Sequence, residues 1–139
     1  MGKTVSEIMT SKVVSISLDE KLDLVDEIMS NGDIRHMPVT QGGRVVGIVS
    51  QRDLLRSKLS TLIDFPEEDR KSLLETTEVE KVMTKSVKFA DPNEPITHAA
   101  ARMVEERIGC LPVVNQDNEL MGLVTETDVM RYFVETSAD

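Results

Sequence analysis

The sequence contains one seven-residue motif twice, and this internal repeat limits what the chain can fold into. GIVSQRD occupies residues 47–53, and GLVTETD occupies residues 122–128. Matching positions upstream of the two copies are 74 residues apart: Met9 with Met83, Thr10 with Thr84, Pro38 with Pro112 and Val39 with Val113. After one inserted residue the separation is 75, which aligns Gly47 with Gly122, Ser50 with Thr125 and Asp53 with Asp128. The chain is therefore predicted to be two copies of one structural unit.

Each copy is predicted to contain a helix, a pair of short strands and a closing helix. Apolar residues recur at helical spacing before the strands: Leu22, Val25, Ile28 and Met29 in the first copy, and Ile96, Ala99, Ala100, Met103 and Val104 in the second. The strand pairs are HMPVT with RVVGIVS, separated by the turn signal QGG, and CLPVV with LMGLVT. The closing helices are QRDLLRSKL and ETDVMRYFV.

Capping residues predict where the first helix of each copy begins. Ser17 and Glu20 stand at capping-box spacing, and Gly32 suits the end of that helix. In the second copy, Asp91 is predicted to cap the helix and Pro92 to occupy its first position.

A segment between the copies, residues 57–78, is predicted to be a helical linker or insert. The boundaries are then 1–56 for the first repeat and 79–139 for the second. Leu59, Leu62 and Ile63 have the spacing of an amphipathic helix, and PEEDRKSLLET begins with a proline and two acids, which favours a helix start. Two interpretations stay open: a packing or dimer element, or a solvated helical linker.

The charge of the chain argues against nucleic acid or an anionic membrane surface as a partner. The sequence has 25 acidic and 16 basic residues, for a net charge of −9, whereas phosphate neutralisation by basic residues dominates such binding. No apolar run approaches the roughly 18 residues of a membrane span. A lone cysteine, Cys110, and the lack of a leader pattern predict a cytoplasmic protein.

Catalytic and metal-binding motifs are missing from the sequence. GGRVVG is followed by Ile48 rather than by Lys-Ser/Thr, so it is not a P-loop, and GxGxxG and GxSxG do not occur. His36, His98 and Cys110 do not have metal-ligand spacing. The chain is predicted not to be an enzyme and to need no cofactor.

The repeated segments resemble a tandem pair of cystathionine-beta-synthase (CBS) domains, a Bateman module. The matching residues are IMT and VMT, the MPV and LPV strands, and GIVSQRD and GLVTETD. The resemblance covers nearly the whole chain outside the insert and the termini. It implies an α/β (α+β) fold of two repeats, each strand–helix–strand–strand–helix, packed through their sheets about a pseudo-twofold axis.

The resemblance also implies two clefts that bind adenosine-containing ligands: AMP, ADP or ATP, with NAD and S-adenosylmethionine as further candidates. In the family, the motif aspartate typically contacts the ribose and the hydroxyl residue faces phosphate. Carried onto this chain, the ribose ligands are Asp53 and Asp128, and the phosphate ligands are Ser50, Thr125, Arg35 and His36. The residues predicted to contact the base are Ile34, Met37, Pro38, Ile108, Cys110 and Pro112.

The motif chemistry supports two interpretations. Ser50 with Asp53, and Thr125 with Asp128, have the spacing of helix-capping pairs, which is a structural role alone. A helix N-terminus also attracts phosphate, and a carboxylate one turn in suits a cis-diol. Arg35 grips phosphate well by its fork of donors, but the second copy has Gly109 at that position. The two clefts are therefore not equivalent, although both abut the axis and both are able to use Arg35 and His36.

Two functional hypotheses remain. The first is a stand-alone regulatory module that binds an adenosine compound and signals to a protein effector. The alternative is a dimerisation module with vestigial sites. A homodimer is expected in either case, since the family often pairs two modules through their helices. The residues expected to supply apolar helix surface are Val25, Met29, Leu55, Val104 and Met130.

Overall fold

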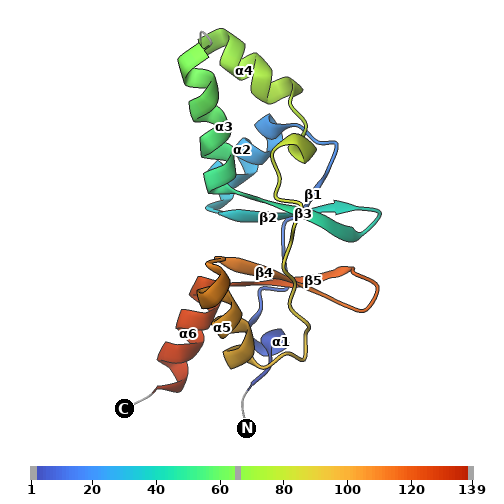
Figure 1. The fold of residues 1–139 in the computed structure, drawn as a ribbon, viewed down its shortest axis with the longest axis vertical. Helices are drawn as coiled ribbons and strands as arrows, with labels where there is room; N and C mark the ends of the chain where they lie inside the picture. Colours follow the sequence, from blue (N-terminus) through green and yellow to red (C-terminus); the bar gives the residue numbers. More distant parts are fainter. Residues whose placement is uncertain (1–2, 65–66, 138–139) are drawn as a thin grey trace. The chain divides into compact units, whose positions relative to one another are not determined.

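The sequence repeats and the folded units of this protein are not the same division of the chain. The structure is a computed structural model that describes residues 3–64 and 67–137, apart from the side chains of 59–70 (Figure 1). Unit 1 consists of Met1–Val13, Gly43–Val45 and Lys88–Asp139, and unit 2 consists of Val14–Gly42 and Val46–Val87. The start of the chain therefore folds with the second repeat.

Unit 2 is built on a three-stranded sheet in the order β1-β2-β3. Its elements are β1 (Ile16–Ser17), α2 (Leu22–Gly32), β2 (His36–Gln41), β3 (Arg44–Ser50), α3 (Gln51–Asp64), α4 (Glu67–Thr76) and a 3-10 turn, η1 (Val79–Lys81). The first two residues of β3, Arg44 and Val45, are grouped with unit 1. β1 runs parallel to β2, with Ile16 opposite Val39. Gly42 and Gly43 have φ of 59° and 82°, and this positive pair closes the β2–β3 hairpin as QGG predicts.

Unit 1 repeats this plan with a shorter sheet. Its elements are α1 (Val5–Ile8), α5 (Ile96–Glu106), β4 (Cys110–Val114), β5 (Leu120–Thr125) and α6 (Glu126–Thr136). β4 and β5 are antiparallel, with Cys110 opposite Thr125. The first strand predicted for this repeat is reduced to one parallel bridge, between Ala90 and Val113. These residues match Ile16 and Val39 at the 74-residue spacing.

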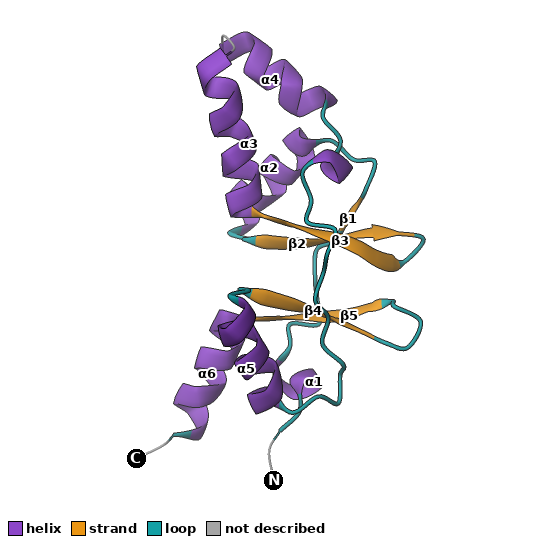
Figure 2. Ribbon diagram, in the orientation of Figure 1, coloured by secondary structure: helices purple, strands orange, loops and turns teal. Residues whose placement is uncertain are grey.

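Both cores are aliphatic, and in each unit the helices cover one face of its sheet (Figure 2). Unit 2 buries Ile16, Leu22, Val25, Met29, Met37, Val39, Val49, Leu54 and Val79. Unit 1 buries Val5, Ala90, Ala99, Met103, Leu111, Val113 and Val124. Each Val or Leu moved out of water contributes about 1.5–3 kcal/mol. Val5 is fully buried among residues of the second repeat, which is why the first residues belong to unit 1.

The predicted helix starts at Ser17 and Asp91 are wrong. α2 begins at Leu22 and α5 at Ile96, so each helix starts several residues later. The Ser17 hydroxyl donates to Asp19 Oδ1 at 2.7 Å, and Asp91 Oδ1 accepts from the Asn93 N–H at 2.8 Å. These side chains stabilise turns upstream of the helices, because Ser and Asp bond to nearby groups in turns as readily as at caps.

Both helices end on a left-handed residue. Asp33 follows α2 with φ of 51°, and Arg107 follows α5 with φ of 56°. Gly32, expected at the cap, is instead the last residue of α2.

The segment after the first repeat is largely helical. α3 continues to Asp64, and α4 follows and contacts α2 and α3. The side chains of Leu59, Leu62 and Ile63 lie outside the described residues. Leu74 of α4 is partly buried against the unit 2 core, which favours a packing element over a solvated linker. Within the described residues, no helix combines the length and the apolar character that crossing a membrane requires.

Candidate functional site

The second motif forms a complete capping box at the start of α6. The Thr125 N–H donates to Asp128 Oδ2 at 2.9 Å, and the Asp128 N–H donates to Thr125 Oγ1 at 3.3 Å. The Asp128 side chain is only 5% exposed. Its other oxygen, Oδ1, has two longer contacts, 3.5 Å from Thr10 Oγ1 and 3.4 Å from Arg131 Nη1. The carboxylate is thus buried and held by three residues.

The first motif has the same reciprocal pair. The Ser50 N–H donates to Asp53 Oδ2 at 3.0 Å, and the Asp53 N–H donates to Ser50 Oγ at 3.0 Å. Asp53 is half-buried, whereas Asp128 is buried. The capping role predicted for both motifs is therefore confirmed, and it leaves the ligand role as a separate prediction.

The first strand of each hairpin is joined to the motif by a backbone hydrogen bond. The Gln51 N–H, the first of α3, donates to the carbonyl oxygen of Arg35 at 2.8 Å. The Glu126 N–H, the first of α6, donates to that of Gly109 at 3.1 Å. Each bond sets the predicted strand-start residues beside the helix N-terminus of their own unit. The structure thus brings Arg35 close to Ser50 and Asp53, and Gly109 close to Thr125 and Asp128.

The residues predicted to contact a base divide into two groups by exposure. Ile34 and Ile108 precede the strands and are half-buried. Four others are buried: Met37, Pro38, Cys110 and Pro112. Met37 belongs to the unit 2 core, so the structure gives it a packing role. Among the phosphate candidates, the Arg35 side chain is exposed and His36 is half-buried.

The thiol of Cys110 is protected from ionisation. Burial raises its pKa to about 12, and the negative charge of Glu126 adds to this effect. A thiol is a nucleophile only as the thiolate, so Cys110 is a small buried residue here, as the sequence indicated.

A contact that sequence reasoning missed involves the repeated Met-Thr pair. Thr10 pairs with Leu123 of β5 through two backbone hydrogen bonds of 2.9 Å. In unit 2, Thr84 pairs in the same way with Ile48 of β3. Each motif strand is thus extended at its edge by the Met-Thr segment of the other repeat. The 74-residue spacing of these pairs was the available signal, but spacing does not reveal the partner strand.

Metal binding finds no support in the described ranges, where no group of three or more His, Cys, Asp or Glu side chains is placed to hold an ion.

Comparison with known proteins decides the family. The family model described as CBS domain matches twice, at residues 5–60 and 79–135. The chain belongs to the CBS domain family. The α/β arrangement of this CBS domain pair is also that of solved structures. CBSX2 from Arabidopsis thaliana, in complex with AMP, matches with a TM-score of 0.83 and 25% identity, over 99% of this chain and 100% of that one. Protein MJ1225 from Methanocaldococcus jannaschii matches with a TM-score of 0.83 and 26% identity, over 95% of this chain and 48% of that one.

Curated relatives include larger proteins. The CBS domain pair is 32% identical over 129 residues to a homoserine O-acetyltransferase of Methanococcoides burtonii, which covers 92% of this chain and 24% of the enzyme. It is 27% identical to a CBS domain-containing protein of Dictyostelium discoideum, over 97% of this chain and 94% of that protein. The chain spans about a quarter to a half of the length of several relatives that it matches. The likeness to the acetyltransferase therefore does not extend to most of that enzyme.

Proposed function

We propose that this CBS domain pair binds an adenosine-containing ligand and passes the occupancy on to a protein effector. AMP, ADP and ATP are the first candidates, and NAD and S-adenosylmethionine are further ones. The carrying observation is that both repeats keep the hydroxyl–aspartate pair at a helix N-terminus with a strand-start residue bonded beside it. The likeness to CBSX2, whose structure contains AMP, supports this choice of ligand. The ligand acts as a regulatory signal rather than as a catalytic cofactor.

The roles proposed for the site residues follow from their chemistry. The carboxylates of Asp53 and Asp128 accept hydrogen bonds from a ribose diol, and Ser50 and Thr125 face phosphate at helix N-termini. Arg35 and His36 add positive charge for phosphate, and Ile34 and Ile108 are the partly exposed apolar contacts for the base. A cytoplasmic setting belongs to this proposal, because a single free thiol suits a reducing compartment.

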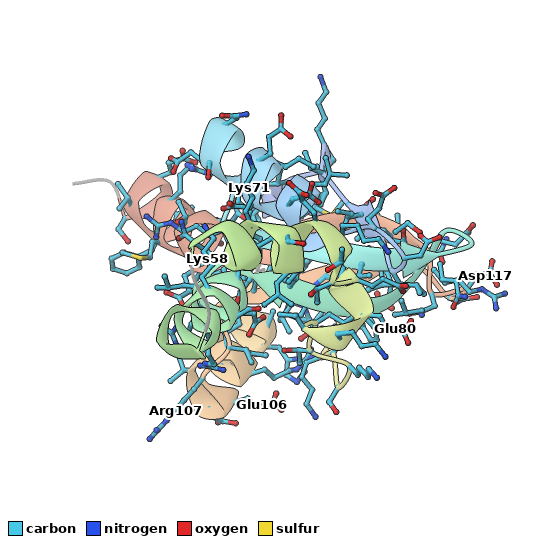
Figure 3. The ribbon with its side chains drawn as sticks, turned by 90° about the horizontal axis from the view of Figure 1, so that it is seen from above. Lys58, Lys71, Glu80, Glu106, Arg107 and Asp117 are labelled. Atoms are coloured by element: carbon cyan, nitrogen blue, oxygen red, sulfur yellow. The ribbon has the colours of Figure 1, made fainter. Side chains whose placement is uncertain are left out.

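Thermal unfolding with added ligand tests the proposal. A ligand that binds only the folded state stabilises it, by about 2.7 kcal/mol at roughly 100 times its Kd. We expect at least one of AMP, ADP, ATP, NAD and S-adenosylmethionine to raise the Tm, and Asp53→Ala or Asp128→Ala to reduce that shift. Asp117→Ala is the matched control, because Asp117 is an exposed acid in the β4–β5 turn (Figure 3). If none of the five compounds at millimolar concentration shifts the Tm, the ligand proposal is wrong.

A second candidate function, an interaction module, is favoured by an exposed apolar surface on α5 and α6. Val104 is 77% exposed, Val134 70%, Phe133 67% and Met130 66%. Large exposed apolar patches commonly mark interfaces, and we propose that a second copy of the chain covers this one. Two of the residues expected to supply apolar helix surface, Val25 and Met29, are instead buried in the unit 2 core. The two functions are compatible with each other. A ligand titration distinguishes a regulatory module from a module that only dimerises, because the second should bind none of the five compounds.

A further inference from the structure

An asparagine followed by a glycine ends α2. Asn31 and Gly32 are the last two residues of this helix, and both are exposed. The matching positions at the end of α5 are Glu105 and Glu106, so the second repeat does not have this pair. The other asparagines of the chain each precede a glutamate or a glutamine: Asn93, Asn115 and Asn118.

An Asn-Gly pair is chemically reactive, because glycine has no Cβ to shield its backbone nitrogen. The nitrogen of Gly32 forms a bond to Cγ of Asn31. The side-chain nitrogen of Asn31 then leaves as ammonia, taking with it the proton of the Gly32 amide. Water opens the resulting cyclic imide at one of its two carbonyl groups. The net reaction is hydrolysis of one amide, and it needs only water.

The two ways of opening the imide give two products at position 31. Opening at the side-chain carbonyl leaves aspartate. Opening at the main-chain carbonyl leaves isoaspartate, in which the backbone runs through the former side chain and is longer by one methylene group. Either product carries a carboxylate, which is ionised at neutral pH, where Asn31 was neutral.

The closed helix protects Asn31 from this reaction. Inside an α-helix the N–H of Gly32 donates to the carbonyl four residues earlier. The helical ψ of Asn31 also directs that nitrogen away from Cγ of its own side chain. The reaction therefore requires the last turn of α2 to open.

Several features make this last turn easy to open. Glycine is a poor helix former, and the last turn of α2, which lies within the described residues, contains no basic residue. Glu27, four residues before Asn31, and Asp33 add negative charge near the negative end of the helix dipole. The turn is closed by the N–H groups of Asp33 and Ile34, which both donate to the Met29 carbonyl, the second at 3.3 Å. Helix ends of this kind open locally without unfolding the domain.

We propose that Asn31 is a site of spontaneous deamidation, that opening of the last turn of α2 controls its rate, and that the product weakens the end of the helix. A carboxylate at this position repels Glu27 and lies at the negative end of the helix dipole. In the isoaspartyl product, the added methylene lies between Met29 and Ile34, so the hydrogen bond that closes the turn no longer fits.

Peptide mapping by mass spectrometry tests the site. The full chain is incubated at mildly alkaline pH, folded and in urea. Asn31 should convert before the other three asparagines in both conditions, and roughly tenfold more slowly in the folded chain, because the turn is open for only part of the time. Gly32→Ala should slow the conversion at least tenfold by shielding the nitrogen. Its new Cβ would lie 3.0 Å from the flexible end of the Ile34 side chain, so this variant should fold.

Ser30→Ala tests whether opening of the helix controls the rate. Ser30 is exposed in the same turn, and alanine favours the helix while the Asn-Gly pair stays intact. Conversion should slow about twofold in the folded chain and stay unchanged in urea. The proposal is overturned if Ser30→Ala leaves the folded rate unchanged, or if Asn31 in the folded chain converts no faster than the other asparagines.

Urea unfolding of Asn31→Asp, which carries the charge of the product, tests its effect. This variant should raise the equilibrium constant for unfolding about threefold, and added salt should reduce the effect. Asn31→Gln keeps a neutral amide and is the matched control, for which no rise is expected. Equal stability of the two variants at low salt would overturn the claim that the product weakens the helix end.

Discussion

The backbone of Gly122 lies directly against the thioether of Met9. A Cβ on Gly122 would lie 2.5 Å from Met9 Sδ and 2.9 Å from the carbonyl oxygen of Thr10, closer than real Cβ contacts. Gly47 has the same relationship with Met83 in unit 2. Glycine in both motifs is therefore explained by packing, because the Met-Thr segment of the other repeat lies against the strand at that point.

Gly122→Ala is expected to destabilise the chain by about 1–3 kcal/mol, the usual cost of overpacking. The Met9 side chain is able to rotate away from the new methyl group. The Thr10 carbonyl cannot move in this way, because it accepts a backbone hydrogen bond from Leu123. Chemical denaturation measures the change. Gly47→Ala should destabilise the chain less, because the nearest atoms to a Cβ at Gly47 all belong to the flexible side chain of Met83.

Gly42→Asn is the control for these glycine variants. Nothing lies within 4 Å of a Cβ at Gly42, and its φ of 59° is one that Asn tolerates. A loss at Gly42 equal to that at Gly122 would contradict the packing explanation.

Asp128→Ala is expected to cost more stability than Asp53→Ala. Removing the buried carboxylate leaves the Thr125 N–H without its acceptor, at a cost of about 1–3 kcal/mol. Asp53 is half-buried, and its loss should cost roughly 1 kcal/mol, as for other capping residues. Urea unfolding of both variants without ligand gives the comparison, and equal losses would show that burial of Asp128 adds nothing. Asp117→Ala should stay within about 0.5 kcal/mol of wild type.

Glu94 makes unit 1 sensitive to acid. Burial alone would raise its pKa, but hydrogen bonds from Arg102 at 2.8 and 2.9 Å, and from His98 at 2.7 Å, hold the pKa below the ordinary value of 4.5. Because the folded pKa is depressed, the stabilisation is fully present above pH 4.5 and is lost as the pH falls through the folded pKa. Glu94→Gln should therefore be less stable than wild type at pH 7, by about 1–3 kcal/mol.

The difference in the free energy of unfolding between Glu94→Gln and wild type should shrink as the pH is lowered below 4.5. Urea unfolding at each pH measures this difference. Glu105→Gln, at an exposed acid on α5, is the control that removes the same charge, and its stability at pH 7 should stay within about 0.5 kcal/mol of wild type. A constant difference for Glu94→Gln across this range would show that its ionisation does not stabilise the fold.

Cys110 should react with iodoacetamide only when the chain unfolds. A rise in pKa from 9.0 to about 12 lowers the thiolate fraction roughly a thousandfold, and burial blocks access as well. Mass spectrometry of labelling at pH 8 in buffer and in denaturant measures both rates. Similar rates in the two conditions would contradict the placement of the thiol.

Light scattering tests the dimer. We expect a mass near twice the 15.5 kDa of one chain, and Phe133→Glu should return the mass to that of a monomer, since it places a charge in the proposed interface. Lys71→Ala makes the same change in net charge on α4 and should leave the mass unchanged. A wild-type chain of 15.5 kDa at micromolar concentration excludes the dimer.

The hairpins could be predicted closely because their signals are local. CLPVV and LMGLVT coincide with β4 and β5, and the QGG turn supplies the two positive φ values. The internal repeat then fixed the order of elements in each copy. The predicted helix starts were wrong because Ser17 and Asp91 suit turns as well as helix caps. The sequence does not show which group their side chains bond to.

The difference between Asp53 and Asp128 was beyond prediction from the sequence. The two aspartates occupy identical positions in their motifs, but Asp128 is buried and Asp53 is only half-buried, and Thr10 is one of the residues that contact Asp128. Thr10 lies 118 residues away from Asp128, so no local pattern indicates this contact. The burial of Val5 in the core of the second repeat also depends on contacts with residues far away in the sequence, so no local pattern indicates it.

The burial of Val5 in unit 1 also bears on the order in which the chain acquires its structure during synthesis. Unit 2 contains only residues up to Val87, so it has its full set of residues while the ribosome is still adding the rest. Unit 1 needs Met1–Val13 together with Lys88–Asp139. Its N-terminal segment therefore cannot complete its contacts until α6 has been synthesised. Closing so long a loop is entropically costly and slows folding. Residues 3–13 are therefore made before unit 2 but are among the last to find their native contacts, and a nascent chain stalled before α5 would expose them.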